Sequence, residues 1–373
     1  MIKSSVEDEL ESFFETLSGV APDCLAVTKS AFTQARSKLK YTAFIALNQQ
    51  LLEQAIPAYD QRWRAFRILA VDGSVINLPD QPMLRAHFDP LAKHMPQARA
   101  SQLYDVLNQL TLDAVIDPMK VDERSQARGH LNQAKAGDLV LYDRGYPAFY
   151  LFACHRAKGI DFCARSPWNL YNETRDFWLS GKRECIVTLT ATKEARQQCL
   201  QAGINHQALT VRLIRVDLSS EESEVLITSV LASERIPAEA FGELYHLRWG
   251  VEEDYKKIKQ RMELEQFSGY SVLAIQQDFH AKVLSKNLTS LLVSSAQEHV
   301  NEKTAHRKHP YQVNFTRAIS RMKHNIVRLF LASEPRKQLE RLIRLMASSY
   351  EAVRPGRSFD RKKQRSGKFK RAR

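Results

Sequence analysis

The chain has 373 residues, 44% of them hydrophobic and 26% charged, which is enough for two or three globular units that need neither disulfides nor zinc. A formal net charge of +13 favours a polyanion as partner, because summed positive potential attracts phosphates. The five cysteines show no paired spacing, and neither a leader nor an apolar run of about 18 residues is present, so we expect a cytoplasmic protein with no membrane partner.

Residues 1–60 are predicted to form a helical N-terminal DNA-binding region, because apolar residues recur there at helical spacing. Segment 27–39 is predicted to be the second helix of a helix-turn-helix, with Ser30 as its cap. Arg36 and Lys38 would then reach DNA from this helix. An amphipathic helix with a charged outer face is the alternative interpretation.

Residues 61–165 alternate between predicted strands and helices, the pattern of an α/β sheet with helical cover. An apolar strand leads to Asp72, and the following Asp-Gly-Ser predicts a turn and a returning strand. A short buried strand, 138–142, ends at Asp143. Further strands are predicted at 103–108, 111–116 and 160–165, and helices at 122–135 and 148–158.

Residues 166–234 differ in composition and are predicted to form a β-rich insertion. Strands are predicted there at 184–190, 209–216 and 225–230. Helix then returns from about 237 to 262 and recurs over 271–300, 312–333 and 336–350. We therefore expect the second part of the α/β core at 235–300 and a C-terminal helical region at 301–353.

The end of the chain, 354–373, carries most of the excess positive charge. Ten Lys or Arg residues face one acid, Asp360, so the segment has a net charge of +9 and leaves +4 for the rest (13 − 9). We predict a basic tail that is disordered until it meets a partner. A tail that is simply solvated is the alternative.

Asp72 and Asp143 share a sequence context. Each follows a strongly apolar strand, and a glycine comes directly or one residue after it. In open α/β sheets, sites form beyond the carboxyl ends of the strands, where an acid is held by rigid backbone and still meets solvent. Taken alone, each aspartate is also an ordinary turn residue.

A third acid is selected by helical geometry. At about 100° per residue, Glu252 falls on the same face of the predicted helix as Tyr245, Arg248 and Lys259, and the two acids that follow Glu252 fall elsewhere. An ordinary salt bridge between Arg248 and Glu252, four residues apart, is the alternative. Three carboxylates suit two divalent cations, because Mg²⁺ prefers oxygen ligands and two-metal cleavage of a phosphodiester needs the ions roughly 3.5–4 Å apart.

At these residues the chain resembles the DDE transposases of the insertion-sequence-4 family, which are bacterial cut-and-paste enzymes. The family hallmark Y-x2-R-x3-E-x6-K is met by Tyr245, Arg248, Glu252 and Lys259. The other landmarks are Asp72-Gly73-Ser74 and Asp143-Arg144-Gly145-Tyr146. The stretches TKSAFTQARSKL and RPGRSFDRKKQRSGK also resemble members of this group, so the resemblance covers nearly the whole chain.

The resemblance implies a ribonuclease H-like catalytic core interrupted by the β-rich insertion. It implies an enzyme that cuts transposon ends and joins them to target DNA, with Asp72, Asp143 and Glu252 as catalytic metal ligands. Mg²⁺ is the implied cofactor, and Mn²⁺ substitutes for it. The implied partners are double-stranded DNA, as terminal inverted repeats and target, and a second copy in a homodimer associated with the nucleoid.

The resemblance also implies DNA contacts. Tyr245, Arg248, Lys259 and the neighbouring Lys256 would contact phosphates near the cleaved end. A tryptophan of the insertion holds a flipped base in some relatives, and Trp168 and Trp178 are the candidates here, although core packing is the ordinary role of a tryptophan. A long C-terminal dimerisation domain is not evident.

Two other functions are open. A non-catalytic, domesticated DNA-binding relative would keep the fold, but here all three acids and their basic companions remain. A structure-selective nuclease with the same core would cut DNA without joining it.

Overall fold

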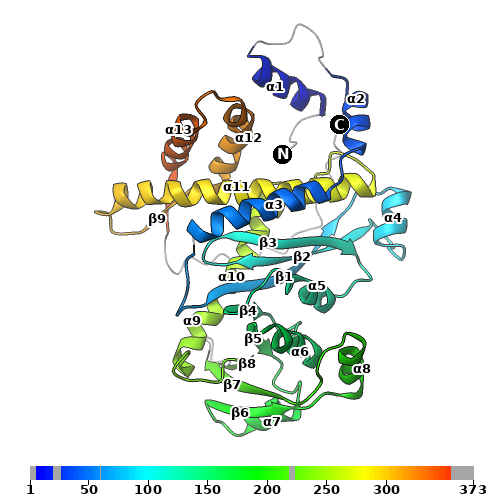
Figure 1. Ribbon diagram of the computed structural model, residues 1–373, viewed down its shortest axis with the longest axis vertical. Coiled ribbons are helices and arrows are strands. Elements are labelled where there is room, and N and C mark those ends of the chain that lie inside the picture. The colour runs from blue at the N-terminus through cyan, green and yellow to red at the C-terminus, as the bar shows by residue number, and fades with distance from the viewer. Residues whose placement is uncertain (1–5, 20–26, 59, 218–222, 354–373) are drawn as a thin grey trace. The chain divides into compact units, whose positions relative to one another are not determined.

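The structure is a computed structural model that describes residues 6–19, 27–58, 60–217 and 223–353 (Figure 1). Two compact units divide the chain. We call residues 52–256 the sheet unit, and residues 1–51 together with 257–373 the helical unit. The predicted basic tail, 354–373, lies outside the described residues.

The sheet unit is built on one mixed sheet of eight strands in the order β3-β2-β1-β4-β5-β8-β7-β6 (Figure 1). Strands β1, β4 and β5 run parallel, and every other neighbouring pair is antiparallel. The strands are β1 Arg67–Asn77, β2 Gln97–Asp105, β3 Leu110–Pro118, β4 Asp138–Tyr142, β5 Asp161–Ser166, β6 Glu184–Leu189, β7 Leu209–Asp217 and β8 Ser223–Thr228. The prediction of an α/β fold is confirmed.

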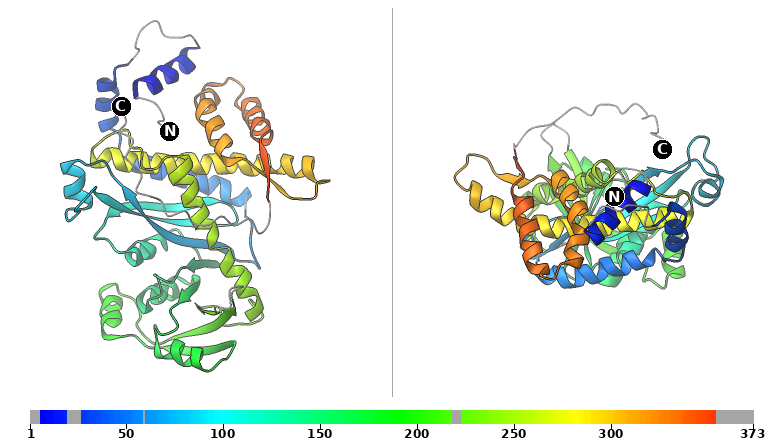
Figure 2. Two further views of the ribbon diagram at one scale, coloured as in Figure 1. Left: turned by 180° about the vertical axis from the view of Figure 1, so that it is seen from behind. Right: turned by 90° about the horizontal axis from the view of Figure 1, so that it is seen from above.

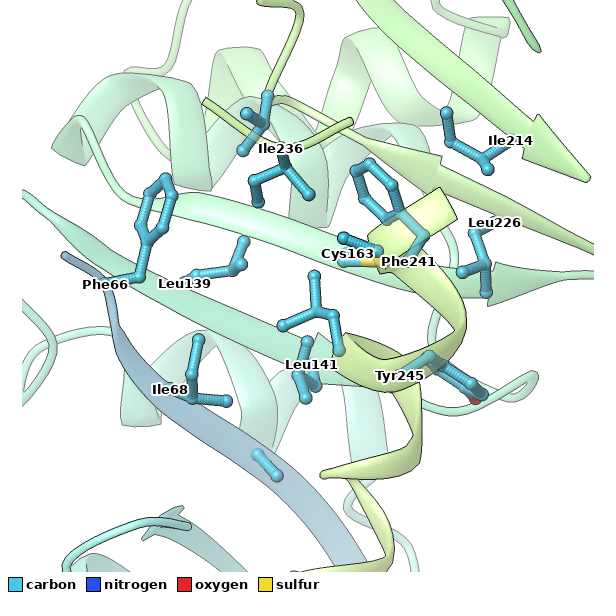
Figure 3. Close-up of a cluster of buried hydrophobic side chains, with 14 of the residues drawn as sticks. Phe66, Ile68, Leu139, Leu141, Cys163, Ile214, Leu226, Ile236, Phe241 and Tyr245 are labelled. Carbon is cyan, nitrogen blue, oxygen red and sulfur yellow. The ribbon is translucent and has the colours of Figure 1, made fainter. Parts of the chain in front are cut away.

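One face of the sheet packs against α9 and α10. Successive side chains of a strand point to opposite faces, so Ile68 and Ala70 of β1 share a face with Leu139 and Leu141 of β4. Phe241 and the other apolar residues of α9 (Phe241–His246) and α10 (Trp249–Lys256) close this core (Figure 3).

The opposite face packs against α5 (Glu123–His130) and α6 (Phe149–Lys158). Phe152 of α6 stacks on Phe162 of β5, with ring centroids 4.2 Å apart. His155 of α6 meets Tyr142 of β4, whose hydroxyl lies 2.9 Å from His155 Nε2. Helical cover on both faces makes the sheet a buried central layer. Short helices α4 (Pro82–Phe88) and η1 (Ile56–Ala58) complete the first half of the unit.

The segment predicted as a β-rich insertion extends the same sheet. β8 pairs directly with β5, from Cys163↔Thr228 to Ser166↔Val225, and β7 and β6 follow outward. Two helices that were not predicted, α7 (Asn172–Leu179) and α8 (Lys193–Gln201), lie between these strands in the chain. The domain boundaries drawn from the sequence stay predictions.

Two predicted elements of the sheet unit are wrong in detail. β1 is one continuous strand through Asp72-Gly73-Ser74, so there is no returning strand, and Asp72 pairs with Gln102 of β2. The predicted helix 237–262 is also not continuous: η2 (Ala238–Ala240), α9 and α10 are followed by a π-helical segment, Lys257–Arg261. The π-helical turn interrupts the regular spacing of an α-helix.

The helical unit contains α1 (Val6–Ser18), α2 (Lys29–Ser37), most of α3 (Thr42–Ala55), α11 (Val272–Thr304), α12 (Phe315–Leu331) and α13 (Pro335–Ala347). Figure 2 shows α12 and α13 side by side against α11, and the three share a core with Val300, Met322 and Leu342. β9 (Tyr311–Val313) precedes α12 and β10 (Tyr350–Ala352) follows α13, and the two strands pair as a two-stranded antiparallel sheet.

The second helix of the predicted helix-turn-helix forms as α2, with a different cap. Thr28 Oγ1 accepts a hydrogen bond from the backbone N–H of Ala31, so Thr28 and not Ser30 is the N-cap. A threonine in extended backbone before the first turn is a preferred cap.

Among the described residues, no helix is long and apolar enough to cross a bilayer.

Candidate active site

The two aspartates stand level on neighbouring parallel strands. β1 pairs with β4 from Arg67↔Asp138 to Ala70↔Leu141, which is an offset of 71 positions. Asp72 and Asp143 have the same offset (143 − 72 = 71), two positions beyond the last pair. Adjacent strands lie about 4.8 Å apart, so the register brings the two residues next to each other.

Both aspartates continue the face that α10 covers. Asp72 follows Ile68 and Ala70 in the alternation of β1, and Asp143 follows Leu139 and Leu141 of β4. Asp143 is in the turn after β4, as predicted from its sequence. The carboxylates therefore extend from the edge of an apolar core towards the helix that carries the third acid.

Glu252 lies in the first turn of α10 and is held by Arg248. Arg248 Nη2 donates to Glu252 Oε1 at 2.7 Å, so the ion pair considered as the alternative does form. The Arg248 guanidinium lies 5.6 Å from the ring centroid of Tyr245 and 5.4 Å from that of Trp249. Cation–π contacts and burial fix this guanidinium, which in turn fixes Glu252.

The surroundings of Asp72 disfavour the charged form of its carboxyl group. Burial raises the pKa of Asp72 to about 7, and the negative charges of Asp143 and Glu252 add to the rise. The backbone N–H of Gly73 and the charge of Arg248 act in the opposite direction. Asp143 and Glu252 are therefore close enough for their charges to act on Asp72, and a bound cation would relieve this concentration of negative charge.

The donor set fits a hard divalent cation. It offers three carboxylates and neither thiolate nor imidazole, which is the chemistry of magnesium or manganese rather than zinc. Among the described residues, however, no three or more His, Cys, Asp or Glu side chains converge as ready metal ligands. Glu252 is engaged with Arg248, so its carboxylate must change partner to join a shared site.

Tyr245 does not face solvent as a phosphate contact requires. Its side chain is 8% exposed, and its hydroxyl donates to the backbone carbonyl of Tyr142 at 3.3 Å. Arg36 is likewise engaged within the helical unit, where it donates to Gln277 Oε1 at 2.6 Å and Asp278 Oδ1 at 2.8 Å. Both side chains make these contacts within the protein, whereas Lys38 is exposed, and the DNA contacts predicted for all three residues stay predictions.

The other predicted DNA contacts have varied surroundings. Trp168 is 43% exposed in the turn after β5, the strand beside β4, and Trp178 is half-buried with its ring centroid 4.6 Å from the Arg215 guanidinium. Lys256 is exposed and pairs with Glu253. Lys259 is in the π-helical segment, where 100° per residue does not hold. Their roles stay predictions.

Three residues of the site were not found from the sequence. Tyr255 Oη donates to the backbone carbonyl of Asp72 at 3.2 Å, and Asp254 accepts from Gln102 Nε2 at 3.2 Å. Tyr146 is buried, and its hydroxyl has no hydrogen-bond partner in the described part of the chain. In the sequence, Tyr255 looks like an ordinary core residue and Asp254 shared its charge with two neighbouring acids, whereas Tyr146 stood in the landmark Asp143-Arg144-Gly145-Tyr146 with no role of its own.

The chain is similar to known proteins. The profile of the family described as Transposase DDE domain matches residues 63–288. The transposase InsG of insertion sequence element IS4 from Escherichia coli (strain K12) is 26% identical over 339 residues, which is 88% of this chain and 74% of that protein. A cryo-EM structure of the piggyBac transposase synaptic complex with hairpin DNA has a TM-score of 0.41 and 11% identity, covering 91% of this chain and 68% of that one.

Proposed function

Because the chain belongs to the Transposase DDE domain family, we propose that it cuts the ends of its own insertion sequence and joins them to target DNA through Asp72, Asp143 and Glu252. The observation that carries this proposal is the placement of both aspartates, level on parallel strands, on the sheet face covered by the helix of Glu252. Burial raises the pKa of Asp72, and the negative charges of Asp143 and Glu252 add to the rise, which supports the proposal.

The three carboxylates would hold divalent cations, with Mg²⁺ as the natural ion and Mn²⁺ as a substitute. Such ions, when bound, supply a reactive nucleophile at neutral pH and stabilise the leaving oxygen of the phosphodiester. The chain's own contribution is to fix the acids on or directly beside rigid elements: Asp72 in β1, Asp143 directly after β4 and Glu252 in α10. The apolar core beside the three acids leaves water access to them only from the other side.

The partner is double-stranded DNA, as terminal inverted repeats and as target, and a homodimer would bring two ends together. Exposed Lys38, Lys256 and Trp168 are proposed contacts. Arg248 and Lys259 stay candidates for phosphate contacts. Sedimentation of the protein with end DNA tests the dimer, because a complex with the mass of one protein copy and one end would contradict it.

The test is cleavage of the terminal repeats in Mg²⁺ or Mn²⁺. Asp72→Ala, Asp143→Ala and Glu252→Ala should each abolish cleavage and keep DNA binding. Glu253→Ala is the matched control, because Glu253 is the adjacent acid on the same helix and is exposed and paired with Lys256. Intact cleavage in any of the three acid variants would refute the assignment.

The same assay separates the alternatives. A non-catalytic DNA-binding protein would bind the repeats and cut nothing in either metal. A structure-selective nuclease would cut, but would leave no product joined to target DNA.

A further inference from the structure

Two tyrosine hydroxyls connect α9 and α10, the helix of Glu252, to the backbone at or beside the two aspartates. Tyr245 of α9 donates to the carbonyl of Tyr142, the residue directly before Asp143, at 3.3 Å. Tyr255 of α10 donates to the carbonyl of Asp72 itself, at 3.2 Å. Both tyrosine side chains are buried, at 8% and 7% exposure.

The two bonds bracket Glu252. Tyr245 precedes it by seven residues and Tyr255 follows it by three, so one bond fixes the chain on each side of the acid. Each acceptor carbonyl lies at or beyond the end of the β1–β4 pairing, which stops at Ala70↔Leu141. A buried carbonyl beyond the β1–β4 pairing needs a donor, which is the tyrosine hydroxyl at Tyr142, and the hydroxyls of Tyr255 and Ser101 at Asp72.

The two tyrosine side chains contribute more than the packing of their rings. A phenyl ring would pack into the same core, whereas a hydroxyl bond fixes the sliding and rotation of the helix relative to a particular peptide group. The bonds join each aspartate-bearing strand directly to the segment that carries the glutamate. The spacing among the three carboxylates therefore depends on the two hydroxyls.

We propose that Tyr245 and Tyr255 are positioning residues that hold the segment carrying Glu252 against the strands that lead to Asp72 and Asp143, so that Glu252 can join the two aspartates in binding a cation. This rests on the proposed function, since it assumes that the three acids hold a metal. It gives Tyr245 a role different from a phosphate contact, and gives Tyr255 a role that its sequence does not indicate.

Removing one hydroxyl should not unfold the protein. The apolar core beneath α9 and α10 stays in place (Figure 3), and Asp254 of α10 still accepts from Gln102 of β2. Tyr→Phe variants at positions 245 and 255 keep the ring and remove only the bond. Tyr150→Phe is the matched control, because the Tyr150 hydroxyl accepts from Arg128 on the other face of the sheet.

The experiment measures Mn²⁺ binding to the full-length protein without DNA, by calorimetry, for Tyr245→Phe, Tyr255→Phe, the double variant and Tyr150→Phe. Loss of one hydrogen bond that aligns the site should raise the Kd for Mn²⁺ about fivefold, and loss of both should raise it further. Tyr150→Phe should bind as the unaltered protein does. Cleavage by the two single variants should recover at high Mn²⁺, so that the metal concentration for half-maximal rate rises and kcat is kept.

Unchanged Mn²⁺ affinity in both single variants and in the double variant would overturn the positioning role. A fall in kcat that high Mn²⁺ does not restore would also overturn it, because the hydroxyls would then act on the chemistry or the fold. Asp72→Ala, measured in parallel, separates the two proposals. If Mn²⁺ binding survives in Asp72→Ala, the metal site itself is refuted; if it is abolished there and kept in the tyrosine variants, only the positioning role is refuted.

Discussion

The buried ion pair between Arg67 and Asp138 keeps the two aspartate-bearing strands in register. Arg67 Nε and Nη2 donate to Asp138 Oδ1 and Oδ2 at 2.8 and 2.6 Å, and both side chains are 5% exposed. The two residues are also register partners at the start of β1 and β4. Because Asp72 and Asp143 each lie five residues further on, this pair sets how level they are.

Arg67→Met removes the guanidinium and keeps much of the side-chain volume. Asp138 then retains the backbone N–H of Lys135, at 2.7 Å, but loses its buried counter-charge. Breaking one side of such a pair costs about 3–5 kcal/mol. For a unit of this size we expect the melting temperature to fall by roughly 10 °C. Urea denaturation followed by circular dichroism measures the loss of stability.

A double-mutant cycle tests whether charge is the reason. Arg67→Met with Asp138→Asn leaves no buried charge, and the amide oxygen still accepts from Lys135, so the double variant should be more stable than Arg67→Met alone. A destabilisation below about 1 kcal/mol in Arg67→Met, or a double variant destabilised by the sum of the two single effects, would refute the reasoning.

Three further perturbations test other parts of the structure. Gly250→Ala places a Cβ 2.8 Å from Val106 Cγ1, so it should destabilise the fold by about 1–3 kcal/mol in thermal melts. Gly242→Ala, whose Cβ meets nothing closer than 3.6 Å, should not, and equal destabilisation by both variants would contradict the packing argument. Burial lowers the pKa of His155 to about 3, so the folded state keeps it neutral while the unfolded state binds a proton below pH 6.5. Stability should therefore fall by about 2 kcal/mol from pH 7 to pH 5, and His155→Gln should lack that part of the urea-midpoint shift; an identical shift in the variant would count against it. Deleting 354–373 should make the slope of the logarithm of the DNA-binding constant against the logarithm of salt concentration less steep, by about 0.9 for each phosphate that the tail neutralises. An unchanged slope would show that the tail neutralises no phosphates.

The sequence predicted the strand that leads to Asp143 because the features that indicate it, an apolar run and the turn after it, lie within a few neighbouring residues. The five residues of β4 are buried and the chain turns directly after them. Asp72 was different. Asp-Gly-Ser normally favours a turn, but pairing of Asp72 with Gln102 and of Gly73 with Ser101 keeps the strand extended. Local turn propensity was overridden by a partner strand some thirty residues away in the chain.

Helical spacing predicted the contact between Arg248 and Glu252 but not what surrounds it. The i,i+4 pair needs only one turn, and it forms. The break between α9 and α10 and the π-helical segment after Lys256, which contacts α11 and α12, are departures that a fixed angle per residue does not contain. Spacing placed Tyr245 on the helix face of Glu252, and the family resemblance implied that it contacts phosphates; its burial is a property of the fold that neither contains.

The pairing of β8 with β5 has a consequence for engineering. Residues 166–234 cannot be exchanged or removed as a separate cassette, because β5 would then expose its unpaired backbone N–H and C=O groups along one side. A bare edge of this kind recruits strands from other molecules and promotes aggregation. A chimera that brings in a shorter segment from a relative must therefore supply its own cover for β5.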